Sequence, residues 1–537
     1  MTAWLTDPQR FRREVRHSNR IVPCRIGRPS SLTDVLSQAV ARAPDGDALV
    51  AGKVRLSWAA LERLVEWMSA GLVERGVERG DRVVFFMENR IEFVMALFAT
   101  ARLGAIAVPV GTREQAPGLA HIVGDAGARL ILHDLSLTDR LPTEVAHWSL
   151  PEAVEETLEA AALAGFAAGP ALEDVGEDDP LLIMYTSGTT GTPKGAVVSH
   201  GNLVHAGMAY VDCMKLTAAD RSVVVVPLSH ITGLSALVAA AAIAGGALIV
   251  LRHFAVDTFV ATAVAERMTH TVLVPAMYNL LLARTDLRTH ALKAWRVGGF
   301  GGAPMPVTTI DRLRTALPGL GLMNCYGSTE TVVAAAILPP EDLAMHSDAV
   351  GFAVPGATIL VMDDQGRERP PGEPGELWIG GPTVVRGYWQ APEADAANFM
   401  GGYWRSGDLG SIDAVGLVRV HDRIKDMINR GGYKIYSAEV ENVLMGHPAI
   451  AEVAIIGRPC PVLGERVHAV ASLRPEFAGA DIAGSLASFA RDHLADYKRP
   501  ETFLFLTEPL PRNANGKVMK RELKTLLELP EALSDET

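Results

Sequence analysis

The chain has 537 residues and a mass of 57.3 kDa, more than one hydrophobic core usually supports, so at least two domains are expected. Its hydrophobic content of 48% and charged content of 21% are ordinary for a globular enzyme. The net charge of −12 and the isoelectric point near 5.7 argue against a general binder of nucleic acid or of anionic membranes.

The first thirty residues lack an apolar core segment, so no signal peptide is expected. This part of the chain is rich in arginine, and a solvated surface is the expected environment of Arg10, Arg12, Arg13, Arg16, Arg20, Arg25 and Arg28. The four cysteines are widely spaced, which excludes a structural zinc site of the usual spacing and favours a reducing compartment, the cytoplasm.

From about residue 32 to residue 316, amphipathic helices alternate with short apolar strands, a pattern typical of parallel α/β sheets covered by helices. The clearest helices are expected at Leu61–Glu74, Ile91–Leu103, Thr258–Met268 and Ile310–Ala316, and the clearest strands at Arg82–Phe86, Ala105–Val110 and Thr271–Val274. The uncharged run Ile231–Leu251 is rich in alanine and broken by Gly245-Gly246. It predicts a buried helix, a turn and a buried strand rather than a transmembrane segment.

Around Val350–Gly380 the pattern changes to short strands separated by Gly and Pro, which predicts a small β-rich subdomain. A boundary is expected near His421–Asp426, followed by an α+β unit. Its expected elements are strands at Lys434-Ile435, Ile450–Ile456 and His468–Leu473 and helices at Ala438–Met445 and Ile482–His493. We therefore predict a large N-terminal domain, residues 1–421, and a small mobile C-terminal lid, residues 422–537, with the active site between them.

The most informative segment follows the apolar strand Leu181–Tyr185. Residues 186–195 hold five hydroxyl side chains, three glycines, one proline and one lysine, and no side chain suited to a core. Glycines let a backbone approach a ligand closely, and hydroxyls, amides and a lysine bind anionic oxygens. The predicted phosphate contacts are Thr186, Ser187, Gly188, Thr189, Thr190, Gly191 and Lys194. An ordinary nucleotide P-loop is excluded because Gly195 follows the lysine and Ala196–Ser199 is expected to be extended; a flexible linker is the weaker alternative.

This loop resembles the phosphate loop of the adenylate-forming superfamily, which contains acyl- and aryl-CoA ligases, peptide-synthetase adenylation domains and beetle luciferases. Further motifs follow in the order that this family shows, and the resemblance covers roughly residues 30–525. Each motif taken singly has a plainer interpretation: a tight turn for Gly301–Pro304, a helix cap for Asp408, a surface lysine for Lys517. Their fixed order favours the family.

The resemblance implies an ATP site. Gly302, Ala303 and Pro304 match the turn that packs against adenine. In the segment Asn324–Glu330, Tyr326 matches the residue that stacks on adenine, Thr329 the α-phosphate contact and Glu330 the ligand of Mg²⁺, and Asn324 and Gly327 complete the motif. Asp408 matches the residue that binds both ribose hydroxyls, and Arg423 also reaches the ribose.

The resemblance also implies the catalytic groups. Lys517, in the segment Pro511–Lys517, matches the catalytic lysine of the lid, and Lys425 lies where the family has its hinge. Joining a carboxylate to the α-phosphate of ATP brings two anions together, so positive charge from Lys194, Lys517 and Mg²⁺ is required. Thr186 is expected to assist at the phosphate. His230 matches a residue between the acyl pocket and the thiol tunnel; a core histidine is its alternative.

The acid is expected to be aromatic or aliphatic of medium length, because the candidate pocket residues are mostly apolar: His230, Leu234, Ala276, Met277, Gly299, Phe300 and Val332. CoA is the expected acceptor, and its predicted contacts on the lid are Gly431, Gly432, Lys434 and Arg458. Ile231 stands where peptide-synthetase domains for α-amino acids have an Asp, so a stand-alone acid–CoA ligase using ATP, Mg²⁺ and CoA is predicted.

Three alternatives stay open: an enzyme that loads a carrier protein, a luciferase-like oxygenase, and a nucleotide-binding module without catalysis. No nucleic-acid partner and no transmembrane segment are expected, and a homodimer is compatible with the sequence. The chain departs from the family at Asp422, where Gly is usual, and at Ser437, where Pro is usual. Because neither position bears a reacting group, altered behaviour of the hinge or lid is expected there rather than lost chemistry.

Overall fold

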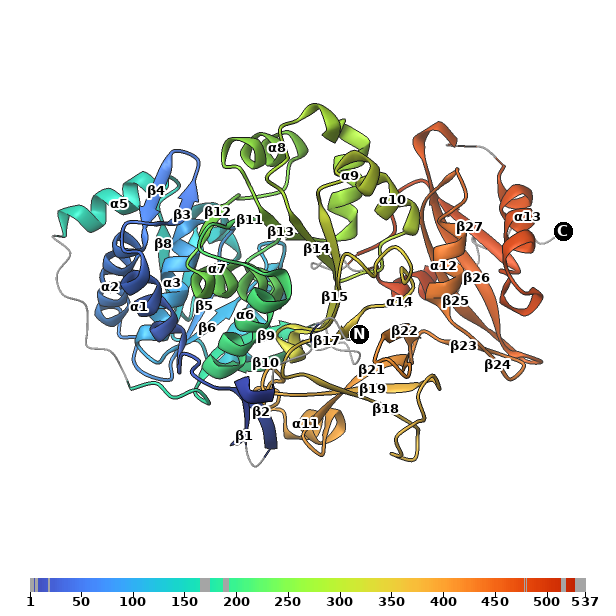
Figure 1. Ribbon diagram of the computed structural model, residues 1–537, viewed down its shortest axis with the longest axis horizontal. Helices are drawn as coiled ribbons and strands as arrows, with labels where there is room; N and C mark the ends of the chain where they lie inside the picture. The colour runs from blue at the N-terminus through green and yellow to red at the C-terminus, as the bar shows by residue number, and fades with distance from the viewer. Residues whose placement is uncertain are drawn as a thin grey trace.

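The computed structural model describes residues 4, 8–17, 20–164, 174–186, 193–477, 479, 481–512 and 518–526. A large α/β domain with a β-rich subdomain lies beside a smaller α+β C-terminal domain, as predicted (Figure 1). No helix in these residues is long and apolar enough to cross a membrane.

The first sheet of the large domain has the strand order β10-β9-β6-β5-β7-β8 and is parallel except for the antiparallel pair β9 and β10. Its strands are β5 (Arg82–Phe86), β6 (Ile106–Pro109), β7 (Leu130–Asp134), β8 (Ala146–Leu150), β9 (Pro180–Thr186) and β10 (Lys194–Ser199). The extended conformation predicted for residues 196–199 is therefore confirmed.

The second sheet has the order β17-β16-β15-β14-β13-β11-β12-β3-β4, with a parallel centre and antiparallel edges. Its strands are β3 (Asp47–Ala51), β4 (Val54–Ser57), β11 (Arg221–Val224), β12 (Ala247–Val250), β13 (His270–Leu273), β14 (Val297–Gly301), β15 (Gly321–Gly327), β16 (Ala334–Leu338) and β17 (Phe352–Ala353).

Helices fill the space between these two sheets: α1 (Leu32–Arg42), α2 (Trp58–Glu74), α3 (Ile91–Arg102), α6 (His200–Met214) and α7 (Ala240–Ala244), the last preceded by a π-helical turn, η3 (Gly233–Ala239). Residues 91–101 of α3 are all buried, as expected for a helix covered on every side. Ser199 and Asn202 form a reciprocal capping box at the start of α6. The uncharged run 231–251 forms the predicted buried helix, turn and strand.

The outer faces of the sheets carry the remaining helices. The first sheet packs against α4 (Ala116–Ala126), and the second against α8 (Val256–Ala265), α9 (Pro275–Arg284) and α10 (Val307–Ala316). α5 (Val154–Leu163) lies near α2. The β-rich subdomain contains β18 (Thr358–Met362), β19 (Gly375–Gly380), α11 (Pro392–Asn398), β20 (Phe399–Met400), β21 (Tyr403–Ile412) and β22 (Val418–Arg423).

The C-terminal domain has a core of its own, formed by buried residues between Ile428 and Leu494. Its sheet has the order β24-β23-β26-β25, and β27 joins β26 in parallel. The elements are β23 (Ile428–Arg430), β24 (Tyr433–Ile435), α12 (Ser437–Leu444), β25 (Ile450–Cys460), β26 (Gly464–Leu473), α13 (Ala483–His493), β27 (Thr502–Leu506) and α14 (Lys520–Leu526). The exact domain boundary at residues 421/422 stays a prediction.

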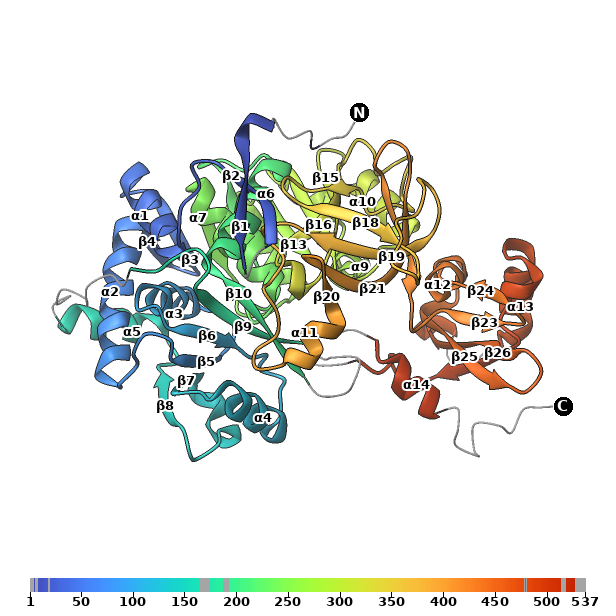
Figure 2. The same ribbon diagram turned by 90° about the horizontal axis from the view of Figure 1, so that it is seen from below.

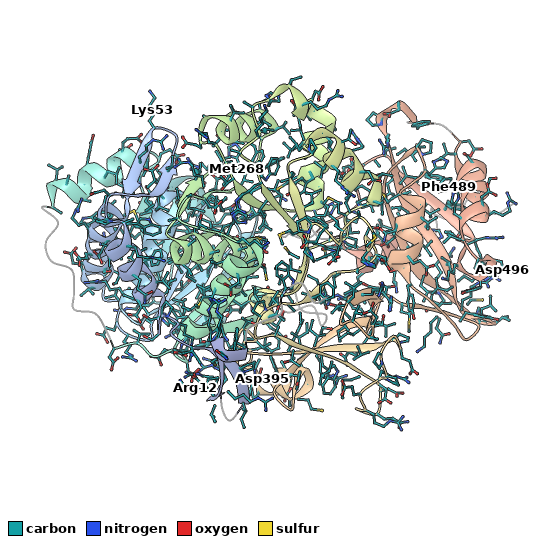
Figure 3. All side chains as sticks on the ribbon, in the orientation of Figure 1. Arg12, Lys53, Met268, Asp395, Phe489 and Asp496 are labelled. Carbon is teal, nitrogen blue, oxygen red and sulfur yellow. The ribbon has the colours of Figure 1, made fainter. Side chains whose placement is uncertain are left out.

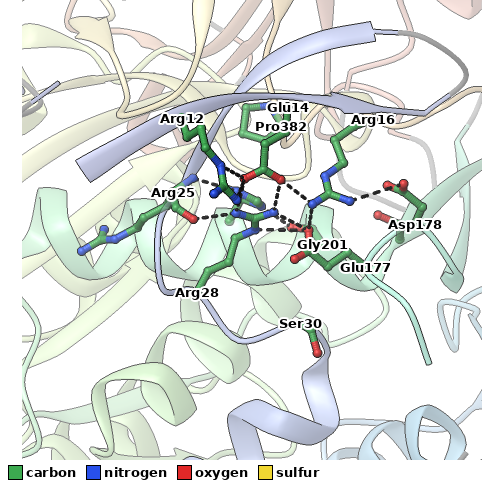
Figure 4. A network of polar contacts seen from close by, with 12 residues as sticks. Arg12, Glu14, Arg16, Arg25, Arg28, Ser30, Glu177, Asp178, Gly201 and Pro382 are labelled. Carbon is green, nitrogen blue, oxygen red and sulfur yellow. Dashed lines mark hydrogen bonds and ion pairs between the residues drawn. The ribbon is translucent and has the colours of Figure 1, made fainter. Parts of the chain in front are cut away.

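The expectation of a solvated surface holds for only some of the N-terminal arginines: Arg10, Arg12 and Arg13 are exposed, whereas Arg16, Arg20, Arg25 and Arg28 are partly buried. They lie on and near the hairpin of β1 (Phe11–Arg16) and β2 (Arg20–Arg25), where Figure 4 shows a network of ion pairs. The Arg28 side chain is only 6% exposed and its Nη2 lies 2.7 Å from a carboxylate oxygen of both Glu14 and Glu177. Arg16 contacts the same two carboxylates. The expectation is wrong here because Glu177, remote in sequence, brings the hairpin onto the large domain.

Candidate active site

The candidate phosphate loop connects two paired strands of the first sheet. Thr186, the last residue of β9, pairs with Lys194, the first of β10, and its Oγ1 lies 3.4 Å from the Lys194 carbonyl oxygen. A Cβ at Gly195 would lie 2.4 Å from Cγ2 of Ile183, so this position requires glycine for close packing. The predicted contacts Ser187, Gly188, Thr189, Thr190 and Gly191 lie outside the described residues.

Three predicted ligands of the nucleoside are in direct contact. Tyr326, near the end of β15, donates a hydrogen bond from its hydroxyl to Asp408 Oδ2 at 2.6 Å, and Arg423 Nε lies 2.6 Å from Asp408 Oδ1. Asp408 and Arg423 are register partners on β21 and β22, so pairing of these strands brings the two charges together. Burial and the neighbouring carboxylate raise the pKa of Tyr326 well above its usual value, so the phenol stays protonated.

The Asp408 carboxylate retains acceptor capacity for a ligand. Its side chain is about 7% exposed, and each of its two oxygens has one partner among the described residues. Because a carboxylate offers roughly four lone-pair sites, two ribose hydroxyls can still donate to it. The arrangement is suited to hold a diol at a fixed position.

Glu330 lies in the short turn that follows β15. Its Oε2 accepts a hydrogen bond from Ser328 Oγ at 2.6 Å and its Oε1 accepts one from the Tyr388 hydroxyl at 2.9 Å. Lys194 Nζ lies 5.7 Å from the centre of the Tyr388 ring, so Tyr388 stands between the candidate metal ligand and the phosphate loop. Tyr388 was missed by the sequence analysis, because no local pattern marks its contact with a residue 58 positions away.

The surroundings of Glu330 fit a magnesium ion. In the described part of the chain its carboxylate is engaged by hydroxyl donors and not by an arginine or lysine, so its charge is not neutralised. Within the same ranges no three His, Cys, Asp or Glu side chains gather into a complete metal site. Mg²⁺ commonly uses one or two carboxylates and takes its other ligands from water and substrate phosphates.

The turn predicted to face adenine is exposed beside Tyr326. Gly302 has φ of 79°, and Gly302, Ala303 and Pro304 are all exposed. β14 and β15 pair with Gly301 opposite Cys325, which places this turn next to the end of β15. Asn324 donates from Nδ2 to the Ala349 carbonyl at 3.1 Å, which leaves its Oδ1 as the atom that can face a ligand.

His230 lies in the loop that follows β11, and Asn89 holds this loop in place. Asn89 Nδ2 donates to the carbonyls of Val226 and Leu251 at 2.9 and 3.2 Å, and its Oδ1 accepts from the Leu228 amide at 2.7 Å. Removal from water lowers the pKa of His230. Asn89 was also missed by the sequence analysis, since its partners lie more than a hundred residues away.

The candidate pocket residues are not gathered into one cluster. Leu234 and Val332 are buried in the core between the two sheets, whereas Phe300 packs into the core on the other face of the second sheet. Gly299 and Phe300 are neighbours on β14 and therefore point to opposite faces. The remaining candidates differ in exposure: Met277 is half-buried and Ala276 is exposed. Val332 has φ of 59°, which is strained for a β-branched residue and marks the turn beside Glu330 as a functional candidate.

On the C-terminal domain, the predicted CoA contacts Gly431 and Gly432 lie beside the hairpin that carries a third, Arg458. Gly431 and Gly432 form the turn between β23 and β24 with φ of 58° and 90°, and the Gly431 amide donates to Leu463 in the turn between β25 and β26. Arg458 lies opposite Arg466 on that second hairpin, and Lys434 is exposed. Lys425 is exposed in the segment between β22 and β23. Lys517 lies outside the described residues.

Comparisons with known proteins agree with this geometry. The family model described as AMP-binding enzyme matches residues 36–389, and that of the AMP-binding enzyme C-terminal domain matches residues 439–517. A feruloyl-CoA synthase of Amycolatopsis sp. is 34% identical over 90% of this chain and 96% of its own length. An indoleacetate–CoA ligase of Aromatoleum aromaticum is 35% identical, covering 88% and 93%. The solved o-succinylbenzoate CoA synthetase of Bacillus subtilis, in complex with its acyl-adenylate intermediate, superposes with a TM-score of 0.84 at 30% identity, covering 93% and 99%.

Proposed function

Because this chain belongs to the AMP-binding enzyme family, we propose that it is an ATP-dependent carboxylic acid–CoA ligase. The observation that carries the proposal most directly is the contact of Tyr326, Asp408 and Arg423, which come from two different sheets. An aromatic residue, a diol acceptor and a cation at one place would be suited to bind a nucleoside.

In the first reaction, the carboxylate of the acid attacks the α-phosphorus of ATP. A bond forms between the carboxylate oxygen and phosphorus, the bond to the β-phosphate oxygen breaks, and pyrophosphate leaves. Lys194 and Lys517 would neutralise charge on the phosphoryl oxygens, and Thr186 would donate to them. Mg²⁺, held by Glu330, would supply further positive charge at the phosphates.

In the second reaction, the thiolate of CoA attacks the acyl carbon of the adenylate. A carbon–sulfur bond forms, the carbon–oxygen bond to AMP breaks, and AMP leaves. The turn at Gly431-Gly432 and the hairpin with Arg458 would border the path of the thiol, and arginine is suited to the phosphates of CoA. Burial lowers the pKa of His230, so its ring would stay uncharged near neutral pH and would not form an ion pair with the phosphate of the leaving AMP.

For the acid we propose an aromatic or medium-length aliphatic carboxylate. The apolar character of Leu234, Met277 and Val332, which pack in or against the core between the two sheets, supports this, as do the names of two relatives, a feruloyl-CoA synthase and an indoleacetate–CoA ligase. Because all four cysteines are free, we also propose that the enzyme works in the reducing cytoplasm.

A panel of aromatic and aliphatic acids tests the proposal. With the right acid, the protein should release pyrophosphate in the presence of Mg-ATP, and should form a thioester only when CoA is added. Thioester formation with a carrier protein but not with CoA would show that the acceptor is a carrier protein. Light emission with oxygen uptake would indicate the oxygenase, and no exchange of pyrophosphate with any acid would contradict the proposal.

Replacing Glu330 by Gln should weaken metal use. The amide oxygen can still accept from Tyr388, but a neutral amide is a poorer ligand for a hard cation. We expect slower adenylation and a Mg²⁺ requirement raised by about tenfold, a size typical of a perturbed metal site. A magnesium titration of pyrophosphate release measures this. Tyr388→Phe is the matched control: it removes the hydrogen bond and keeps the carboxylate. An unchanged titration in Glu330→Gln would exclude Glu330 as a ligand.

A further inference from the structure

Asp422 and Ser437, the two residues that differ from what the family resemblance leads us to expect, bind each other. The Ser437 amide donates to Asp422 Oδ2 at 2.5 Å and the Ser437 hydroxyl donates to Asp422 Oδ1 at 3.0 Å. Asp422 is only 6% exposed and Ser437 is fully buried. A proline at position 437 has no amide hydrogen to donate, and a glycine at position 422 has no carboxylate to accept it. Both departures are therefore needed for this contact.

A lysine completes the cluster. Lys520, the first residue of α14, donates from Nζ to the Ser437 hydroxyl at 2.6 Å, and the same Nζ lies 2.6 Å from Glu441 Oε1. The Ser437 hydroxyl thus accepts from Lys520 and donates to Asp422. Burial raises the pKa of Asp422 and the positive charge of Lys520 opposes that rise, so the lysine helps to keep the carboxylate ionised.

This cluster crosses between the two parts of the molecule. Asp422 belongs to β22, which pairs with β21 in the large domain, whereas Ser437 opens α12 of the C-terminal domain. The adjacent residues His421 and Tyr436 form a second contact between the same two parts, since their rings stack with centres 5.4 Å apart and planes 16° apart. Residues 424–427 connect β22 to β23, so any rotation about this segment must separate Asp422 from Ser437.

The orientation that the cluster stabilises brings α14 toward the large domain. Figures 1 and 2 both show α14 on the side of the C-terminal domain that faces the large domain. Lys520, three positions after Lys517, belongs to this helix and contacts the cluster directly. The cluster therefore couples the helix next to the candidate catalytic lysine to the strand that carries Arg423, the contact of Asp408.

We propose that Asp422, Ser437 and Lys520 are positioning residues that hold the C-terminal domain in the orientation for adenylation and slow its rotation toward thioester formation. We call the contacts among these three residues the clamp. That the two orientations serve adenylation and thioester formation rests on the proposed function, whereas the clamp itself rests on the contacts alone. It also assigns a role to both departures from the family pattern.

Ser437→Pro removes both donors and is compatible with the first position of a helix. We expect it to raise the rate of thioester formation from a supplied acyl-adenylate, relative to pyrophosphate release, by roughly tenfold, as the loss of hydrogen bonds to a charged group allows. Ser437→Ala keeps the amide donor and should change the ratio by roughly threefold. Asp422→Ala should have the same effect as Ser437→Pro. The double variant should have little further effect, because each substitution already removes the contact between Asp422 and Ser437.

Glu439→Gln is the control for a general weakening of α12. Glu439 lies on the same helix and pairs with Lys498 at 2.6 Å, within the C-terminal domain. The ratio of the two half-reactions should stay at the wild-type value in this variant. An equal change in Glu439→Gln and Ser437→Pro, or an unchanged ratio in Ser437→Pro, would overturn the proposal.

A measurement of orientation separates this proposal from the proposed function. Asp311 on α10 and Asp496 are exposed, and Figure 3 shows Asp496 at the outer edge of the C-terminal domain. Fluorescent labels on Asp311→Cys and Asp496→Cys should report one dominant distance in the wild-type background and a second population in Ser437→Pro. An identical distance distribution in both would exclude the clamp, even if the enzyme is active. If no acid gave activity in the panel, the proposed function would be contradicted. The distance measurement would still decide whether the clamp exists.

Discussion

Lys517→Ala should nearly abolish formation of the acyl-adenylate, with pyrophosphate release slowed by ~10²–10³-fold. The reason is electrostatic: Lys517 would supply one of the positive charges at the reacting oxygens, and a preorganised charge of this kind typically contributes that much to the rate. The segments on either side of it are held to the C-terminal domain, since Arg512 pairs with Glu452 and also forms a β-bridge with Val518. Removing the side chain should therefore leave the domain intact.

The same variant should transfer a supplied acyl-adenylate to CoA at close to the wild-type rate, because the lysine is expected to serve only the first reaction. Pyrophosphate release and thioester formation are measured on one preparation. Lys520→Gln is the comparison for the loss of a nearby lysine: it should alter the balance of the half-reactions without abolishing adenylation. Wild-type pyrophosphate release in Lys517→Ala would show that this lysine has been misassigned.

Lys425→Pro should separate the two half-reactions. Residues 424–426 form a turn in which the amides of Asp426 and Met427 donate to the Arg423 carbonyl, and Lys425 itself is exposed. Rotation of the C-terminal domain about residues 424–427 requires large changes of φ and ψ at one or two residues, and proline fixes its own φ near −65°. We expect pyrophosphate release within several-fold of wild type and thioester formation slowed by ~10²-fold or more, as for a blocked obligatory motion.

Lys425→Ala is the matched control, because it removes the charge and keeps the freedom of the backbone. It should support both half-reactions at nearly the wild-type rate. Equal losses in both half-reactions of Lys425→Pro would mean that no hinge operates at this position. Combining Lys425→Pro with Ser437→Pro distinguishes the hinge from the clamp: a loosened clamp should not restore thioester formation when the hinge itself cannot turn.

The elements of the large domain were largely predictable, because their patterns are local. The phosphate loop was expected to leave one strand and enter another, and β9 and β10 confirm this. In contrast, β25 and β26 extend to Cys460 and back from Gly464, beyond the strands expected at residues 450–456 and 468–473. The ends of these strands near the turn carry polar residues such as Arg458 and Arg466, so no alternation of apolar residues marks them in the sequence. They are extended because they pair with each other across the hairpin.

Site residues that belong to family motifs could be predicted from the sequence. Site residues that are defined by contacts with distant segments could not. Tyr326, Asp408 and Arg423 were all predicted, and the structure adds that Tyr326 and Arg423 both contact Asp408. Tyr388 and Asn89 were not, because a hydrogen bond between distant segments leaves no mark on the residues around it. For the same reason Phe300 was grouped with Leu234 and Val332, although alternation along β14 places it in a different core.

The sequence by itself was enough to identify the family, because a loop rich in glycine and hydroxyl side chains, a candidate acidic metal ligand and lysines at fixed positions can be seen without a structure. Only the tertiary structure decided which charges are paired. Arg28 is buried because Glu177 meets it, and Asp422 and Ser437, two unrelated departures in the sequence, become one contact when β22 and α12 meet. The physical reason is that the energy of a charge depends on its partners and its exposure, and both are set by segments that only folding brings together.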